Sequence, residues 1–204
     1  MKNTFLLFLL LFSTLIYSQS VTIDITKSGL GYPSDYYRKD INNLLNPFEG
    51  TYVYTSGNIV FKIVLEKKIK QPNGLHYNDL ILGEYQLIEN GAEKINTLSN
   101  LNVVYVNQYV KHAIAGSGII QKPNSRFWDC PECNPNEKRF SGRIIDRISR
   151  RYADMLMRRT VVNGQEVLQV KIYNIDSKII DENNPEPPEP PFALPKGIFT
   201  MIKQ

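Results

Sequence analysis

Short runs of β-branched and aromatic residues, separated by Asn-Gly, Ser-Gly and Pro-Asn-Gly turns, fill most of the chain from Glu49 onward. The run at 59–65 (IVFKIVL) is almost continuously apolar, as expected of a strand that is covered on both faces. Because no long amphipathic helix separates the runs, the pattern predicts a mainly β fold, an antiparallel meander with at most short helices. The meander is expected to form an up-and-down barrel or a curled sheet. Strands are predicted at 21–25, 50–54, 59–65, 76–82, 83–88, 93–98, 103–110, 113–120 and 197–202.

The segment 143–156 fits two patterns. Its apolar residues form a helical stripe with Arg and Asp on the opposite side. However, Asn163-Gly164 is a strong signal for a two-residue hairpin, whose register pairs Met157 with Val170. We therefore expect a hairpin from about residue 153 onward, while residues 143–152 fit either a strand or a short helix. The hairpin predicts one apolar face and one polar face. The apolar face carries Met155, Met157, Val161, Leu168, Val170 and Ile172. The polar face carries Arg158, Thr160, Gln169 and Lys171.

The first 20 residues have the pattern of a secretory signal peptide. Lys2 precedes an apolar run at 5–11, and the small residues Ser18 and Ser20 follow it. The apolar run is too short to be a dependable membrane span, which needs about 20 apolar residues. We expect export to the periplasm or the cell exterior, with no membrane span after signal removal.

The domain organisation follows from changes in composition. We expect a signal peptide at 1–18, an N-terminal lead-in with a short helix at 19–48, and a β-meander domain at 49–180. An acidic, proline-rich connection at 181–191 then leads to a C-terminal strand at 192–204 that returns to the same domain. In the lead-in, Asp40 is placed to cap helical turns at 40–45 that Asn46-Pro47 would end. This segment is a plug candidate or a linker across the base of the sheet.

Charge is modest overall but concentrated locally. The formal net charge is +4, which alone argues for neither a nucleic-acid nor a membrane partner. Between Lys138 and Arg159, however, eight basic residues face only Asp146 and Asp154. The candidates for binding an anionic surface partner are Arg143, Arg147, Arg150 and Arg151; the alternative is a solvated strand face balanced by acids elsewhere. Few aromatic residues are interleaved, so no specific nucleic-acid binding is expected.

The two cysteines, Cys130 and Cys133, form the sharpest local motif. In an exported protein they would most simply form one local disulfide that staples a loop. A zinc knuckle has the same spacing but needs four ligands, and only His76 and His112 remain to complete one, at no recognised spacing. Free or intermolecular thiols are a further alternative. Ser117 lies between glycines at the wrong offsets for a nucleophile elbow, so we expect no catalytic residue, metal or cofactor, and a protein that is not an enzyme.

Several motifs resemble those of a family of small exported proteins of unknown function from Bacteroidota. They are the stretches at 46–52 (NPFEGTY) and 59–67 (IVFKIVLEK), the strand and turn at 83–91, the Cys-x-x-Cys loop at 130–139 and the hairpin at 163–172. This resemblance implies no activity and no site residues. A looser likeness is to lipocalin-like barrels, where Gly50-Thr-Tyr52 stands in place of their Gly-x-Trp; it implies a barrel that holds a small ligand.

Two functions are therefore expected. One is a non-enzymatic exported domain that binds a small apolar or amphipathic ligand, because a barrel of about eight strands is wide enough to hold one. The other is a structural or surface-interaction module that acts through its exposed faces on a cell-surface partner. An interior lined by small or polar residues around a void favours the first function, and a filled interior favours the second. The sequence predicts neither the ligand nor the oligomeric state.

Overall fold

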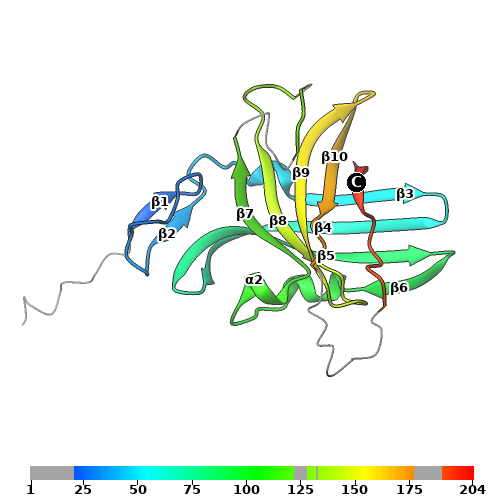
Figure 1. Ribbon diagram of the computed structural model, residues 1–204, viewed down its shortest axis with the longest axis horizontal. Helices are drawn as coiled ribbons and strands as arrows, with labels where there is room; N and C mark the ends of the chain where they lie inside the picture. The colour runs from blue at the N-terminus through cyan, green and yellow to red at the C-terminus, as the bar shows by residue number, and fades with distance from the viewer. Residues whose placement is uncertain (1–20, 122–127, 132, 177–189) are drawn as a thin grey trace, which may run out of the picture.

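The computed structural model describes residues 21–121, 128–131, 133–176 and 190–204 (Figure 1). Within this part of the chain, eight antiparallel strands form a closed barrel. Strands that are neighbours in the barrel are also neighbours along the chain, and the last strand pairs with the first, which confirms the predicted up-and-down barrel. The barrel strands are β3 (Gly50–Ser56), β4 (Ile59–Asn73), β5 (His76–Glu89), β7 (Ile114–Ile120), β8 (Arg139–Ile145), β9 (Tyr152–Val162), β10 (Gln165–Tyr173) and β11 (Gly197–Lys203).

Shorter elements surround the barrel. Strand β6 (Ala92–Asn96) forms a hairpin with the end of β5. Strands β1 (Thr22–Asp24) and β2 (Tyr37–Lys39) pair in parallel with each other, and β2 pairs in parallel with the start of β5. Among the described residues, the helical elements are two 3-10 turns, η1 (Asn46–Phe48) and η2 (Leu98–Asn102), and one helical turn, α2 (Gln108–Lys111).

The ambiguous Arg-rich segment is strand and turn. Strand β8 ends at Ile145, residues 146–150 form a turn in which Arg150 has a φ of +59°, and β9 follows. The hairpin register is as predicted, with Met157 opposite Val170 and Met155 opposite Ile172. The predicted faces are correct, but burial departs from them at two positions. Val161 is 61% exposed because β9 continues past the end of the barrel, and Arg158, on the outer face, is only 7% exposed.

Three other predicted elements need correction. The stretch at 40–45 is a turn, and Pro47 lies inside the helical turn instead of ending it. The runs at 76–82 and 83–88 form one strand, because no turn interrupts β5 at Gly83. The stretch at 103–110 is a loop followed by α2, since the Asn107 side chain accepts a hydrogen bond from the Val110 N–H and caps a helical turn there.

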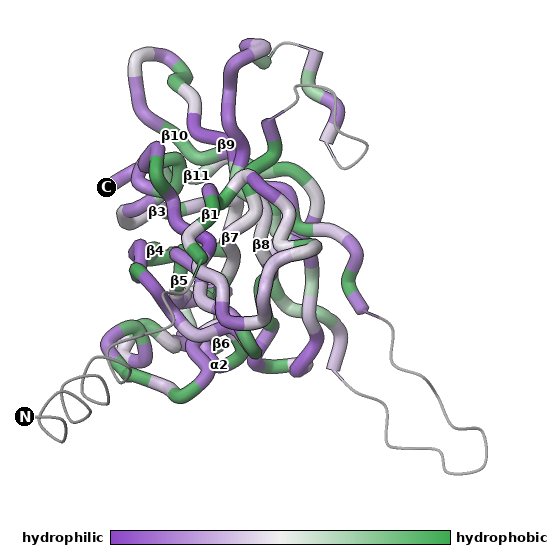
Figure 2. Tube along the Cα trace, turned by 90° about the vertical axis from the view of Figure 1, so that its left-hand side faces the viewer, coloured by the Kyte–Doolittle hydropathy of each residue, from purple (hydrophilic) through white to green (hydrophobic). Residues whose placement is uncertain are grey.

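Side chains occupy the interior of the barrel. Buried residues alternate with partly buried ones along much of β4, and Figure 2 shows hydrophobic and hydrophilic residues distributed along the strands. Inside, the rings of Phe61 and Tyr85 lie 5.6 Å apart between centroids, and Phe199 lies 4.8 Å from Tyr54 and 6.4 Å from Phe61. The same hydrophobic cluster contains further apolar side chains from the barrel strands: Ile63, Leu65, Leu87, Ile144, Met155, Met157, Leu168, Val170, Ile172 and Met201.

The lead-in closes one end of this core. Leu45 and Phe48 are buried in the same cluster, and the Phe48 ring lies 5.7 Å from Phe140 of β8. The Asp40 carboxylate holds the turn, because it accepts hydrogen bonds from the Leu44 and Leu45 N–H groups at 2.7 and 2.9 Å. The lead-in therefore plugs the barrel at the end where β3 begins.

No helix among the described residues is long and apolar enough to cross a membrane. The predicted signal peptide at 1–18 and most of the acidic connection at 181–191 lie outside the described residues. The returning C-terminal strand is present as β11, between β3 and β10, where its pairing closes the barrel.

Candidate functional site

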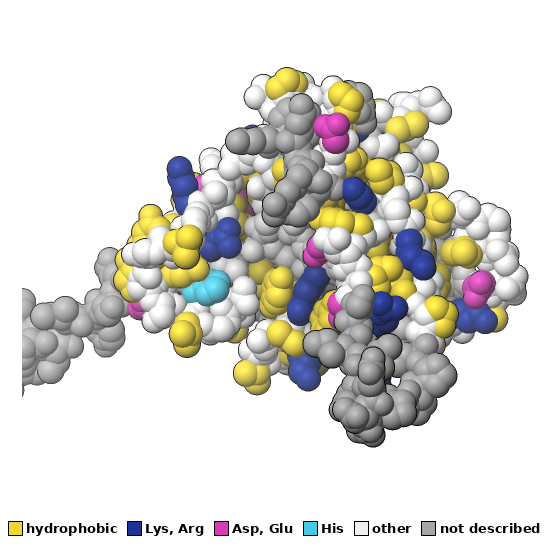
Figure 3. Space-filling view, viewed as in Figure 1, with side chains coloured by type: hydrophobic (Ala, Val, Ile, Leu, Met, Phe, Trp, Pro, Cys, Tyr) yellow, Lys and Arg dark blue, Asp and Glu magenta, His cyan; other side chains and the backbone are white. Residues whose placement is uncertain are grey.

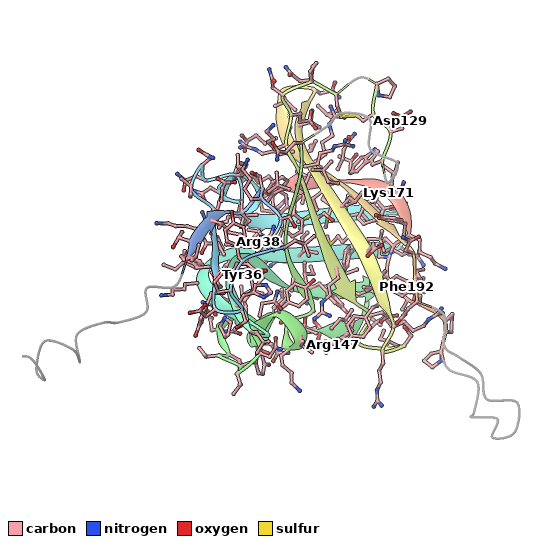
Figure 4. All side chains as sticks on the ribbon, turned by 60° about the vertical axis from the view of Figure 1, so that its left-hand side comes forward. Tyr36, Arg38, Asp129, Arg147, Lys171 and Phe192 are labelled. Carbon is pink, nitrogen blue, oxygen red and sulfur yellow. A yellow bond between two sulfur atoms is a disulfide. The ribbon has the colours of Figure 1, made fainter. Side chains whose placement is uncertain are left out.

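The run of basic residues between Lys138 and Arg159 is divided between the two ends of the barrel. Strands β8 and β9 are antiparallel, so residues at the two ends of the run come together and those in its middle lie at the far turn. Lys138 and Arg159 are near the plugged end, and Arg147, Arg150 and Arg151 are at the turn between β8 and β9. Figure 4 shows Arg147 and Asp129, which is in the disulfide loop, at opposite ends of the molecule.

Three of the four arginines that were candidates for anion binding already donate hydrogen bonds to backbone carbonyls, and one of them also lies over two aromatic rings. The Arg143 guanidinium lies over the rings of Tyr109 and Tyr152, 4.3 and 5.1 Å from their centroids, and donates to the Tyr109 carbonyl. Arg147 donates to the Lys111 carbonyl, and Arg151 donates to the Asp176 carbonyl. Arg150 is exposed. The structure brings Arg147, Arg150 and Arg151 to one turn, and their binding of an anionic partner stays a prediction.

Cys130 and Cys133 are joined in a disulfide. With Trp128 they pack on Leu156, on the outer face of β9. Arg139 lies over the Trp128 ring at 5.9 Å and donates to the Trp128 carbonyl at 2.6 Å. The loop therefore covers part of the barrel wall. Within the described residues, no three His, Cys, Asp or Glu side chains are grouped to hold a metal ion.

A groove lies at the plugged end, between the lead-in and the projecting tip of the β9–β10 hairpin. We call it the end groove. Its volume is about 490 Å³, within the range of about 300–1,000 Å³ typical of ligand pockets. Leu44, Pro47 and Val161 supply apolar surface, and Lys138 and Arg159 supply positive charge. The lining residues are Asn42, Asn43, Leu44, Pro47, Phe48, Lys138, Arg159, Thr160, Val161 and Glu166.

One carboxylate organises the charge at this groove. Glu166 accepts hydrogen bonds from Lys203 Nζ at 3.1 Å and from Arg159 Nη2. These two hydrogen bonds, the one from Lys203 first, hold the pKa of Glu166 below its usual value. Beneath them, burial raises the pKa of Tyr52 to about 12, so its hydroxyl stays protonated. Lys138 makes no ion pair in the part of the chain that the structure describes.

A second polar cluster lies on the outer face of β5, beneath α2. His112 Nδ1 lies 2.8 Å from Glu84 Oε1, and His112 Nε2 lies 2.8 Å from Gln108 Oε1. All three side chains are buried. Because they are covered, the cluster offers no surface to a substrate, and its hydrogen bonds hold α2 against the barrel.

Sequence reasoning found only part of the end groove. Lys138 and Arg159 belong to the basic run, but the predicted candidates lie in its middle. The stretch at 40–45 is predicted as a plug or a linker, and nothing in it indicates that the hairpin tip faces it. The Asn163-Gly164 turn gives the hairpin register, in which Arg159 is a diagonal neighbour of Glu166, whereas the approach of the lead-in is a long-range contact that local pattern does not encode.

The whole chain, residues 1–204, matches the family of unknown function DUF6705, and the protein belongs to that family. No curated protein and no solved structure matches the chain. The family description gives no activity and no ligand.

Proposed function

We propose that this protein is an exported, non-enzymatic barrel that binds an amphipathic anion in the end groove, on its exterior. Side chains occupy the interior, where the ring of Phe61 lies next to those of Tyr85 and Phe199, and this favours a function on the exterior of the barrel over a ligand held inside it. The end groove is concave and combines apolar surface with a few polar groups, which is the usual composition of a small-molecule site.

The charges around the groove favour an anionic head group. Arg159 and Lys203 donate to Glu166, the one carboxylate among the described lining residues, and Lys138 lines the same groove. Arg159 and Lys203 share that carboxylate, while Lys138 has no such partner among the described residues. A carboxylate, sulfate or phosphate head group would bind at Lys138, and an apolar tail would lie along Leu44 and Pro47.

The residues of the groove also support a binding role over a catalytic one. A nucleophile needs an adjacent base of suitable pKa. Thr160 supplies the one side-chain hydroxyl among the described lining residues, and none of them is His or Cys. Glu166 is a weak base because its two cationic neighbours hold its pKa low.

Calorimetric titration with dodecanoate tests the proposal. We expect the protein to bind dodecanoate, and Lys138→Gln to weaken binding about fivefold by removing one charge-assisted contact. Arg150→Gln is the matched control, because it removes an exposed cation from the opposite end, and it should leave the affinity unchanged. Equal weakening by both substitutions, or no weakening by Lys138→Gln, would show that the end groove is not the site.

A cationic amphiphile with the same tail separates charge recognition from apolar adsorption. Dodecyltrimethylammonium should bind more weakly than dodecanoate to the parent protein, and Lys138→Gln should narrow the difference. If the two amphiphiles bind equally well to the parent, the anionic head group has no role and the proposal fails in this respect.

Export is tested separately by N-terminal sequencing of protein recovered from outside the cytoplasm. Cleavage after Ser18 or Ser20 predicts Gln19 or Val21 as the first residue. Recovery of protein that retains Met1 would contradict signal-peptide removal.

A further inference from the structure

A lobe projects from the barrel where two strands continue past their neighbours. Strand β3 pairs with β4 only as far as Leu65. Beyond this point β4 and β5 remain paired with each other as far as Asn73 and His76 and form an arm. Strands β1 and β2 add to the edge of this arm, through pairs such as Tyr37 with Tyr77. We call residues 21–41 and 67–79 the edge lobe. It projects to the left in Figure 1.

The edge lobe has an ordered polar base. The Asp79 carboxylate accepts hydrogen bonds from the Tyr37 hydroxyl at 2.5 Å, the Asp40 N–H at 2.9 Å and the Lys70 N–H at 2.9 Å. Above it, the rings of Tyr36 and His76 stack at 4.7 Å with an angle of 7° between their planes. The turns of the lobe are thus fixed relative to one another.

Each of three turns on this base presents an aliphatic side chain to solvent. Leu30, in the loop before β2, is 89% exposed; Leu75, in the β4–β5 turn, is 79% exposed; and Ile69, at a bulge in β4, is 68% exposed. Tyr32 and Tyr77 are exposed beside them. Figure 3 shows hydrophobic side chains around the histidine on this lobe. Single exposed apolar residues are common on protein surfaces, but here several of them lie on one lobe.

The charges of the edge lobe favour an anionic partner. Its exposed charged side chains are three lysines, Lys27, Lys39 and Lys70, and one acid, Asp35. Lys70 Nζ lies 5.8 and 5.7 Å from the ring centroids of Tyr37 and Tyr77. Aliphatic tips, amphipathic Tyr rings and lysines in one region are the composition of a surface that lies at a lipid–water boundary.

The path of the chain points to the same partner. Residues 1–20, which contain the apolar run at 5–11, join the edge lobe at Val21. In the export that we propose, these residues act as a signal peptide, so the edge lobe is the first part of the mature chain to emerge at the membrane surface, before any barrel strand. Separate projecting tips also suit insertion between lipid head groups, whereas a protein partner requires one closely complementary surface.

We propose that the edge lobe docks on an anionic lipid surface, with Leu30, Ile69 and Leu75 inserted at the boundary between head groups and acyl chains and with Lys70 among the lipid phosphates. This docking goes beyond the proposed ligand binding, because it uses none of the residues of the end groove.

Vesicle flotation tests the docking. The full chain as its host produces it is mixed with vesicles of phosphatidylcholine alone or with 30% phosphatidylglycerol. We expect binding to the mixed vesicles, weakened at least about tenfold in a Leu30→Asn, Ile69→Asn, Leu75→Asn variant because less apolar area is inserted. Lys70→Gln should weaken binding about fivefold on the anionic vesicles only, the effect of one lysine near such a surface.

The matched control uses aliphatic side chains that are as exposed as those of the edge lobe but lie outside it. Val104 and Val106, in the loop before α2, are 85% and 97% exposed. A Val104→Asn, Val106→Asn variant should bind like the parent, and the N-terminus is the same in every variant, so any part of residues 1–20 that is retained contributes equally. Equal loss in the control variant, or no loss in the triple variant, would overturn the proposal.

Two further measurements separate the alternatives. Sedimentation of the parent in the absence of lipid should show a single species that the triple substitution does not change; a dimer that the triple substitution dissolves would assign the surface to a second copy of the chain and overturn lipid docking. Lys138→Gln should leave flotation unchanged, so that failure of the end-groove proposal and failure of this one are distinguishable.

Discussion

Two extensions, the tip of the β9–β10 hairpin and the edge lobe, continue strands of the barrel body. They follow the same alternation of apolar and polar residues as the barrel body but differ from it in what covers them. In β9, Met155 and Met157 point into the filled interior, whereas Val161, on the same face of the same strand, projects past the barrel into solvent. In the edge lobe, Ile69 and Leu75 are likewise exposed at the end of the long β4–β5 arm. Alternation therefore identifies the strand and its two faces, and tertiary contacts decide whether a face is buried.

Charged substitutions at two positions on one strand face test this difference most strongly. Met157→Asp should lower the free energy of unfolding by roughly 3–5 kcal/mol, because it places a charge in the interior and removes apolar contacts. Val161→Asp should change it by less than about 0.5 kcal/mol, as expected of an exposed position. Urea midpoints give both values. A tolerated Met157→Asp would show that the interior of the barrel admits water.

Much of the barrel body was predictable because its information is local. The Asn163-Gly164 turn set the register of β9 and β10 correctly, and turn residues delimited most other strands. The helical stripe at 143–156 was misleading because Ile144, Ile145 and Ile148 belong partly to a strand and partly to a turn. That turn is held by the Asp146 carboxylate, which accepts from the Ile148 N–H at 2.9 Å and the Ser149 hydroxyl at 2.6 Å.

The extensions and the sites on them were not predictable in this way. Tyr37 reaches Tyr77 and Asp79 across some 40 positions of sequence, and the end groove joins Leu44 to Thr160. Such contacts depend on closure of the whole barrel. Exposure of Arg158 was expected from its face, but Glu137 covers that face because the disulfide loop returns over the barrel wall.

The lead-in connects the edge lobe to the barrel body. The Asp40 carboxylate anchors it, and one substitution can remove that anchor. Asp40 is buried and accepts from Lys67 Nζ at 2.8 Å as well as from two backbone N–H groups. Asp40→Asn keeps the size of the side chain but removes its charge, so we expect a loss of about 2–3 kcal/mol in the free energy of unfolding. Chemical denaturation measures it. Asp35→Asn, at an exposed position of the edge lobe, is the control and should have almost no effect.

Two arginines of the basic run test the difference between a covered and an open outer surface. Arg158 Nε donates to Glu137 Oε1 at 2.7 Å, and its Nη1 lies 3.2 Å from Gln169 Oε1. Arg158→Ala should therefore cost about 2 kcal/mol by leaving these partners without a donor. Arg150→Ala should be close to neutral. Thermal unfolding of the two variants in parallel measures the difference. Equal melting temperatures would show that the contacts of Arg158 do not stabilise the fold and that its side chain behaves as a solvated one.

The hairpin tip depends on backbone conformation more than on burial. Asn163 and Gly164 have φ values of +51° and +78°, and both are needed for a tight turn between β9 and β10. Gly164→Val should cost roughly 1–2 kcal/mol, because a β-branched residue is strained at positive φ. Gly164→Asn, which tolerates this conformation better, should recover part of the loss. If the two variants have the same urea midpoint, the turn relaxes to another type.

The smallest expected effect is electrostatic and lies in the edge lobe. Burial, and then the nearby charge of Arg38, lower the pKa of His76 from its ordinary value of 6.5. Between 6.5 and that lower value the unfolded chain binds more protons at this position than the folded chain, so stability is fully present above pH 6.5 and declines as the pH falls through the folded pKa. Titration of the imidazole NMR signals, assigned with His76→Gln, should give a pKa below 6.5 that Arg38→Gln raises and Lys39→Gln leaves nearly unchanged. A value at or above 6.5 in the parent would mean that the stack of Tyr36 on His76 is open to water, and that the edge lobe is less ordered than its hydrogen bonds indicate.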